Sequence, residues 1–179
     1  MLRRIALLAL AGVPAAVVAD RLLARARGGR PPDPMRMLVV VDAPIDAVWA
    51  AVSDVPFQVE WMAEMRELVL DPPGRAHVGQ RGEATVRILG LSVTDPVEVS
   101  ELEPPRRYAI RHLGLFKGGG VMTLEPGADG TTTILRWDET LVPPVLPQLG
   151  ALLQAPVLRA IFQADLERLK ELVEHGAVD

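Results

Sequence analysis

The chain has 179 residues, enough for one domain with a sizeable core and a short additional segment. It contains no cysteine, which excludes disulfides, thiolate nucleophiles and thiolate metal sites. The formal net charge is -4, but residues 1–36 hold seven arginines and only two aspartates, so the rest of the chain is acidic. Because that acidic part has no basic stripe, we expect no nucleic-acid partner.

Residues 1–28 have the features of an N-terminal targeting segment. Two arginines precede an uncharged run over residues 5–19. A signal anchor, a signal peptide cleaved near Ala19 and an amphipathic surface helix all fit this pattern, and we expect the anchor. At about 1.5 Å per residue the run spans roughly 23 Å, less than the roughly 30 Å hydrocarbon layer. If the flanking arginines reach the headgroups, Leu2, Leu22 and Leu23 extend the apolar run.

The position of the arginines predicts the orientation of an uncleaved anchor. More of them follow the apolar run than precede it, and positive flanks stay in the cytoplasm, so the domain would lie at the cytoplasmic face of the membrane. If the segment is instead a signal peptide, its cleavage would leave the domain exported. Residues 29–35 are predicted to form a linker, because glycine and repeated proline propagate neither helix nor strand. The domain then covers residues 36–176, and residues 177–179 form a tail.

After the linker, the pattern predicts a strand and two helices. A β-branched run predicts a strand over residues 37–41. Apolar residues at helical spacing over residues 45–52, with Pro44 suited to a first helical turn, predict an amphipathic helix. The stretch DVPFQVEWMAEM predicts a second helix that is short or broken.

Six short segments separated by glycine and proline turns predict six further strands. They are RELVLDP, RGEATVRIL, SVTDPVEVSEL, RRYAIRHL, GGVMTLEPG and TTTILRWDETL. Turn signals at such short intervals predict an antiparallel meander. The stretch LFKGGGV lacks the spacing of a phosphate-binding loop and the helix that would follow one, so we expect a flexible hairpin loop.

The last predicted element is the longest, a helix over residues 155–176. Its apolar residues recur at intervals of three and four, with Gly176 as a C-terminal cap. These apolar residues are Leu158, Phe162, Leu166, Leu169 and Val173. Only this helix is long enough to cover one face of the sheet, so a gap between helix and sheet would form a cavity.

Four motifs in this order resemble a known superfamily. The stretches VVVDAPIDAVWAAVSDVPFQVEWM, VSELEPPRRYAIRH, DGTTTILRWDETL and DLERLKELVEHG are similar in order and spacing to the START-like (SRPBCC, Bet v 1-like) superfamily, particularly its bacterial polyketide cyclase/dehydrase and lipid-transport branch. The resemblance implies an α+β helix-grip fold, with a curved antiparallel sheet of about six to seven strands around the C-terminal helix and two short helices after the first strand. It also implies a deep, mainly apolar cavity that binds a hydrophobic small molecule. A minority of family members catalyse cyclisation or dehydration of the bound molecule.

One carboxylate falls on the apolar face of the last predicted strand. The two-residue period of TTTILRWDETL puts Glu139 on the face of Leu135 and Trp137, which the resemblance turns toward the cavity. There Glu139 could orient a ligand hydroxyl or act as a general acid. Alternatively, it lies near the strand end, where it reaches water or pairs with Arg107 or Arg111.

His112 is the second candidate for acid–base chemistry. It alternates with Arg111 along the strand RRYAIRHL, so one of the two faces inward. A cavity histidine could shuttle a proton, whereas the alternative is a hydrogen-bonded or rim residue. The further residues expected to line the cavity are Trp61, Met65, Tyr108, Met122, Leu135, Trp137, Leu158 and Phe162. Trp49 is expected in the core.

Other chemistry finds little support in the sequence. The three histidines lie on different predicted elements without metal-ligand spacing, so we expect neither a metal nor another cofactor. No arrangement of serine, histidine and aspartate favours a covalent hydrolase.

Three functions therefore remain. The leading hypothesis is a membrane-tethered domain that binds or transports a lipid, isoprenoid or polyketide-like molecule, because apolar ligands partition into bilayers. The alternative is a polyketide cyclase or dehydratase with Glu139 and His112 as acid and base. The third is a structural or assembly module with a collapsed pocket. The enzyme requires two titratable groups converging in the cavity, whereas a carrier requires only volume and a mouth.

Overall fold

The structure, a computed structural model, describes residues 2–88 and 90–176, and within them the chain forms four helices and one antiparallel sheet. The helices are α1 (Leu2–Ala26), α2 (Ile45–Ser53), α3 (Gln58–Trp61) and α4 (Pro147–Glu174). The strands are β1 (Met35–Val41), β2 (Met65–Asp71), β3 (Arg81–Ile88), β4 (Leu91–Glu103), β5 (Arg107–His112), β6 (Lys117–Pro126) and β7 (Thr133–Val142). The predicted element order is confirmed, although β1 begins inside the predicted linker.

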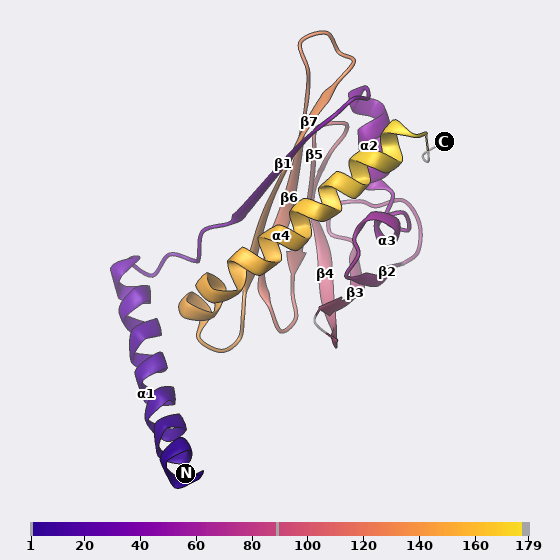
Figure 1. Cartoon of the computed structure of the whole chain (residues 1–179). Coiled ribbons are helices and arrows are strands. Elements are labelled where there is room, and N and C mark those ends of the chain that lie inside the picture. Colours follow the sequence, from indigo (N-terminus) through magenta and orange to yellow (C-terminus); the bar gives the residue numbers. More distant parts are fainter. Residues whose placement is uncertain (1, 89, 177–179) are drawn as a thin grey trace.

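The sheet is a meander of β2 to β7, and β1 adds a further strand at the β7 edge. Its order is β1-β7-β6-β5-β4-β3-β2, with every neighbouring pair antiparallel. Helix α4 crosses one face of the sheet, and α2 and α3 lie beside the C-terminal half of α4 (Figure 1). This arrangement is the predicted α+β helix-grip fold.

The core lies between α4 and the inner face of the sheet. Alternate residues of β1 and β7 are buried, as a strand with one covered face requires. On α4 the predicted apolar stripe is buried along its whole length: Leu158, Phe162, Leu166, Leu169 and Val173. The stripe therefore packs against the sheet as the spacing predicted.

The predicted start of the C-terminal helix at residue 155 is wrong. Helix α4 begins at Pro147 and continues through Pro156. Its first turn is capped by a distant residue, because Oδ1 of Asp20 in α1 accepts hydrogen bonds from the backbone N–H groups of Gln148 and Leu149, each at 2.8 Å. A carboxylate at a helix N-terminus satisfies amide groups that otherwise lack partners, and it adds to Pro147, a residue suited to the first helical position, in stabilising this start.

The expectation of a flexible glycine loop is also wrong for the glycines themselves. Gly118, Gly119 and Gly120 belong to β6 and pair with both neighbouring strands. A Cβ atom on Gly118 would collide with the backbone of Thr140, and one on Gly119 with the carbonyl oxygen of Ile110. Close strand approach, rather than flexibility, explains these glycines.

Helix α1 is attached at the N-terminal end of α4 and projects away from the sheet (Figure 1). Besides the Asp20 cap, Nε2 of Gln148 donates a 3.1 Å hydrogen bond to the carbonyl oxygen of Arg30. Part of the predicted apolar run, residues 5–12, lies outside the residues whose side chains are described. Among the described residues, no helix has the length and apolar character needed to cross a membrane. The membrane-spanning anchor therefore stays without structural support.

Candidate functional site

Glu139 faces the interior, as the strand phase predicted. Its side chain is almost fully buried beside Trp137, and both lie on the inner face of β7. Gly120 is paired opposite Glu139 on β6, where a Cβ atom would collide with the Glu139 carboxylate and lie 3.0 Å from Nε1 of Trp137. The glycine therefore makes room for the 3.0 Å hydrogen bond that Nε1 of Trp137 donates to Oε2 of Glu139.

His112 joins Glu139 to a second buried carboxylate. Its Nε2 lies 3.2 Å from Oε1 of Glu139, and its Nδ1 lies 3.2 Å from Oδ2 of Asp95 on β4. The backbone N–H of Leu115 donates a 2.8 Å hydrogen bond to the other oxygen of Asp95. Three strands thus bring together an Asp95–His112–Glu139 network in which every carboxylate oxygen has a partner.

The alternative pairing of Glu139 with arginine is wrong. Arg107 pairs with Glu101, and Arg111 pairs with Glu98 on the outer face. Because Arg111 points outward, its neighbour His112 points inward, which resolves the alternation that the sequence left open.

The network favours the protonated form of His112. Burial lowers the pKa of the imidazole, but hydrogen bonds and charge from Glu139 and then Asp95 outweigh it, so the pKa lies above its ordinary value. A doubly protonated ring can donate from both nitrogens at once, which matches the two contacts with carboxylate oxygens. The raised pKa therefore favours an imidazolium between the two acids.

Beside this network lies a small hollow, at the place where the deep cavity was expected. Its volume is about 20 Å³, the space of about one water molecule. It is surrounded by one residue of α3, one of the following loop and six of the strands β5, β6 and β7: Gln58, Met62, Tyr108, Ile110, Gly120, Met122, Trp137 and Glu139. The expectation of a deep cavity is therefore not met in this structure.

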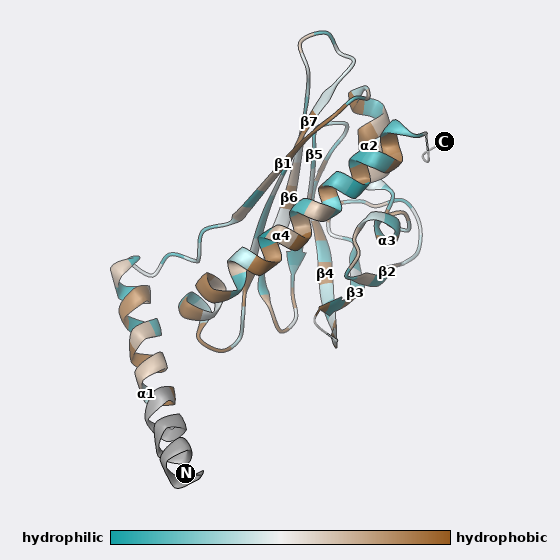
Figure 2. Cartoon of the chain, in the orientation of Figure 1, coloured by the Kyte–Doolittle hydropathy of each residue, from teal (hydrophilic) through white to brown (hydrophobic). Residues whose placement is uncertain are grey.

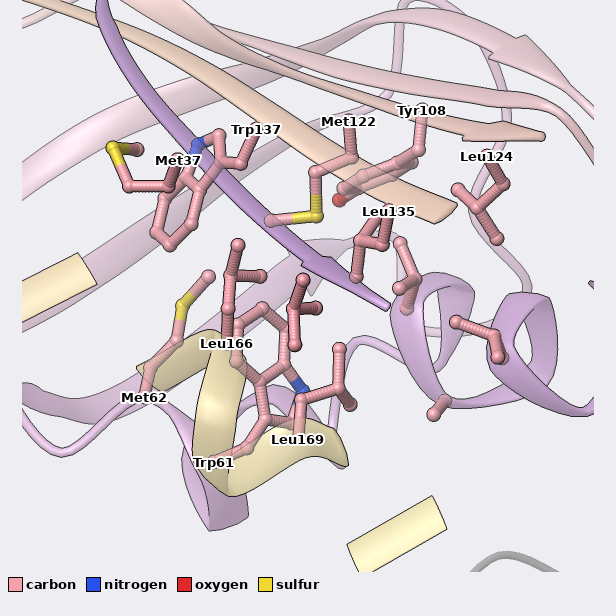
Figure 3. Close-up of a cluster of buried hydrophobic side chains, with 14 of the residues drawn as sticks. Met37, Trp61, Met62, Tyr108, Met122, Leu124, Leu135, Trp137, Leu166 and Leu169 are labelled. Carbon is pink, nitrogen blue, oxygen red and sulfur yellow. The ribbon is translucent and has the colours of Figure 1, made fainter. Parts of the chain in front are cut away.

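Large side chains fill the space between sheet and helix. The Trp137 ring packs at 4.8 Å from that of Phe162 and at 6.2 Å, edge to face, from that of Trp61. Figure 3 shows Trp137 and Met122 from the sheet directed toward Leu166, with Met62 and Trp61 on the other side. Interdigitation of these side chains leaves little room between the layers.

The predicted site residues lie in three places. Four of them line the small hollow: Tyr108, Met122, Trp137 and Glu139. His112 lies behind Glu139, and the others pack within or against the core: Trp61, Met65, Leu135, Leu158 and Phe162.

Sequence reasoning missed Asp95, Gln58 and Met62. Asp95 could have been found, because it alternates with Val97 and Val99 and so shares an apolar strand face, the same signal that identified Glu139. Gln58 is the first residue of the short helix α3 and Met62 directly follows it, and only packing determines where this helix lies.

A larger hollow lies elsewhere, at the C-terminal end of α2. It is an open groove of about 840 Å³, lined by parts of α2, the 74–76 loop and the end of β4. Trp49, predicted as a core residue, is only half-buried and forms one wall of this groove. In the part of the chain that the structure describes, no group of three or more acidic or histidine side chains is arranged to hold a metal ion.

Residues 35–174 match the sequence profile of a family described as polyketide cyclase/dehydrase and lipid transport. The chain belongs to this family. The match begins at the first residue of β1 and ends at the last of α4, so it covers the whole helix-grip domain. No curated protein sequence matches the chain.

Solved structures agree with membership of the polyketide cyclase/dehydrase and lipid-transport family. A protein of Thermus thermophilus is 20% identical, with a TM-score of 0.64 over 80% of this chain and 99% of that one. The ZhuI aromatase/cyclase of Streptomyces sp. R1128 is 18% identical, with a TM-score of 0.62 over 80% and 94%. At these identities the similarity shows the fold.

A third structure has higher identity but is a longer protein. DynU16, a putative protein of the dynemicin biosynthetic locus, is 27% identical, with a TM-score of 0.59 over 82% of this chain and 49% of that one. This chain therefore corresponds to about half of DynU16.

Proposed function

We propose that the chain binds a hydrophobic small molecule with a polar group, in the space between the sheet and α4. One observation carries the proposal: the Asp95–His112–Glu139 network is buried at the edge of an apolar interior, and Glu139 lines the hollow there. Burying several ionisable groups costs more than burying apolar ones of similar size, so a purely structural core has little use for them. The family description, which includes lipid transport, supports this assignment.

Binding requires the hollow to expand. Small-molecule pockets commonly have volumes of about 300 to 1,000 Å³, far above the present 20 Å³. Met62 and Met122 are suited to such a change, because unbranched thioether side chains adopt many shapes at little cost. Trp61 does not line the present hollow, but its Nε1 is buried without a hydrogen-bond partner, a donor that a ligand oxygen would satisfy in a pocket expanded toward it.

A second candidate function is acid–base catalysis on such a ligand, as in a cyclase or dehydratase. Tyr108 and Glu139 line the same hollow, and Glu139 is hydrogen-bonded to His112. Burial raises the pKa of Tyr108, so its hydroxyl stays protonated and can donate a hydrogen bond. This arrangement could pass a proton between a ligand oxygen and Glu139, with His112 restoring the original state. The similarity of fold to an aromatase/cyclase supports this alternative.

We also propose that the N-terminal segment brings the domain to a membrane, at its cytoplasmic face. Support comes from the arginines that follow the apolar run and from the attachment of α1 to the domain through Asp20. An apolar ligand reaches a membrane-bound carrier at a high local concentration.

The first test is to purify the protein under native conditions and identify any co-purifying small molecule by mass spectrometry. A binding test then uses cis-parinaric acid, a fluorescent fatty acid. Met122→Phe, which fills the hollow, should abolish binding, whereas Val121→Phe, on the opposite face of β6, should preserve it. Unchanged binding in Met122→Phe would place the ligand elsewhere, such as the groove beside Trp49, and contradict the proposal.

A further inference from the structure

One end of the molecule carries exposed apolar side chains from several separate segments. The β3–β4 turn, residues 113–116, residues 143–146 and the first turns of α4 all lie at the same end of the sheet, because antiparallel order alternates the connections between its two ends (Figure 1). We call the apolar residues there the loop-end surface: Leu91, Leu115, Val145, Leu152 and Leu153. Each is more than half exposed, and Figure 2 shows the hydrophobic colouring along the first turns of α4 and the loop before it.

The charges around the loop-end surface are almost all positive. Arg21 and Arg25 of α1 and Lys117 of β6 are exposed at this end. The acidic residues of the adjoining segments are engaged: Asp20 caps α4, Asp95 bonds His112, and Asp33 pairs with Arg27. Residues 140–164 contain no acidic residue at all. This end is therefore apolar and cationic, although the whole chain has a net charge of -4.

The loop-end surface also covers the acid–base network. The backbone N–H of Leu115 donates to Asp95, so the loop that exposes the Leu115 side chain is tied directly to the network beneath it. Helix α1, with Val18 and Leu22 exposed, projects from the same end (Figure 1). The apolar surface is thus continuous with the N-terminal helix and adjacent to the proposed ligand site.

We propose that the loop-end surface docks onto an anionic lipid bilayer. The leucines and Val145 enter the boundary between headgroups and acyl chains, while Arg21, Arg25 and Lys117 contact lipid phosphates. A second copy of the chain fits less well, because a symmetric contact would bring the cations of both copies together with no free carboxylate among these segments to pair with them.

Docking in this orientation places the ligand site against the source of an apolar ligand. This benefit of docking rests on the proposed function. A carrier that opens toward the bilayer spares its apolar ligand a passage through water. The docking itself can be measured without any ligand, so the two proposals can fail separately.

The first experiment places a fluorescent probe on the surface of the full chain. Because the chain has no cysteine, Leu115→Cys and Val78→Cys each offer one labelling site for an NBD fluorophore. Val78 is the matched control, with 58% exposure against 55% for Leu115, in the β2–β3 connection at the other end of the sheet. With phosphatidylcholine–phosphatidylglycerol vesicles, the Leu115 probe should shift to the blue and brighten, and the Val78 probe should not change.

Controls separate the loop-end surface from α1. If the chain floats with vesicles but neither probe responds, α1 alone binds the membrane and the inference is overturned. Replacing phosphatidylglycerol with phosphatidylcholine, or raising the salt concentration, should reduce the Leu115 response, because contact with anionic headgroups is screened by salt. An equal response with neutral vesicles would contradict the assigned role of Arg21, Arg25 and Lys117.

The second experiment measures vesicle partitioning of full-length variants. Leu115→Glu or Leu153→Glu should lower the partition coefficient by about tenfold or more, since each removes one leucine that would enter the bilayer and adds a charge in its place. Val78→Glu should leave the partition coefficient within about twofold. Binding of cis-parinaric acid without vesicles should be the same in all three variants, so a variant that loses docking but keeps the fatty acid is still folded.

The remaining outcomes decide between the proposals. Equal partitioning of all three variants overturns docking by the loop-end surface and leaves the proposed function intact. Docking without fatty-acid binding in the unmodified chain contradicts the proposed function alone. A chain that ignores vesicles but forms a dimer that Leu115→Glu separates would identify a second copy as the partner and overturn the inference.

Discussion

Glu139 keeps a carboxylate in an apolar interior because both of its oxygens have partners, one from β5 and one from its own strand, β7. His112 approaches Oε1 and the Trp137 indole donates to Oε2, while Asp95 holds the far side of the imidazole. In a low-dielectric interior such a network is favourable only while every member is satisfied. The effect of changing one residue should therefore appear in the titration of its neighbours.

We predict that Glu139→Gln lowers the pKa of His112. The amide keeps the shape of the side chain but removes one of the two charges that favour the imidazolium, so burial weighs more heavily. The His112 ring resonances in an NMR pH titration measure the change. Asp138→Asn, at the neighbouring position on the opposite face of β7, is the control and should leave that titration unaltered. A His112 pKa that does not move in Glu139→Gln would mean that Glu139 does not stabilise the imidazolium.

A second buried acid affects stability rather than the site. Glu64 lies against Asp165 of α4, and Oε2 of Glu64 and Oδ2 of Asp165 both lack a hydrogen-bond partner unless a proton is shared between them. Burial, and then Asp165, raises the pKa of Glu64 from its ordinary 4.5 to about 8, with Arg168 opposing the change. Glu64 is therefore protonated in the folded protein at pH values where the unfolded chain has it ionised.

This raised pKa predicts that stability falls as the pH rises. The stabilising effect of protonated Glu64 is complete below pH 4.5, declines as the unfolded chain ionises and is lost above about pH 8. Glu64→Gln should flatten this decline in the free energy of unfolding, measured by urea denaturation at several pH values. Glu67→Gln, at an exposed position on β2, should keep the original slope. An unchanged slope in Glu64→Gln would show that another group causes the decline.

Among the elements, α4 connects most of the others. It packs on β1 and β7, contacts α2 and α3, and receives its cap from α1. Its sheet-facing stripe supplies the packing, and its outer face in the first turns supplies Leu152 and Leu153 to the loop-end surface. One helix therefore serves both the core and the proposed membrane contact, on opposite sides.

We predict that Leu169→Ala lowers the free energy of unfolding by about 2 to 5 kcal/mol, because Leu169 is fully buried and the cavity left behind cannot close completely. Glu171→Ala, on the exposed side of the same helix, should change it by less than about 0.5 kcal/mol. Chemical denaturation of both variants gives the comparison. Equal effects would be incompatible with the packing of α4 on the sheet.

At the scale of the whole molecule, the helix-grip domain and α1 are joined at a single end. Among the side chains that the structure describes, the hydrophobic core cluster contains only residues from Met35 onward, so the described part of α1 contributes nothing to the core. The start of α4 does depend on it, through the Asp20 carboxylate.

A chain that begins at Pro34 should therefore fold but lose order at the start of α4. Hydrogen exchange of the Gln148 and Leu149 amides should become faster, while amides near Leu166 stay protected. Asp20→Ala in the full chain should reproduce the local effect, at a cost of about 0.5 to 2 kcal/mol in stability. Unchanged exchange at Gln148 and Leu149 in both proteins would show that the cap does not support α4.

The sequence by itself determined the element order, the buried stripe of α4 and the strand face that Glu139 shares with Leu135 and Trp137. These features follow from periodicity, because backbone conformation fixes where successive side chains point, and that information is local. Only the tertiary structure decided that Asp20 caps α4, that Asp95, His112 and Glu139 meet, and that the expected cavity narrows to about 20 Å³. Such contacts join residues far apart in the chain, and the remaining volume depends on how large side chains from facing layers interdigitate, which no local pattern encodes.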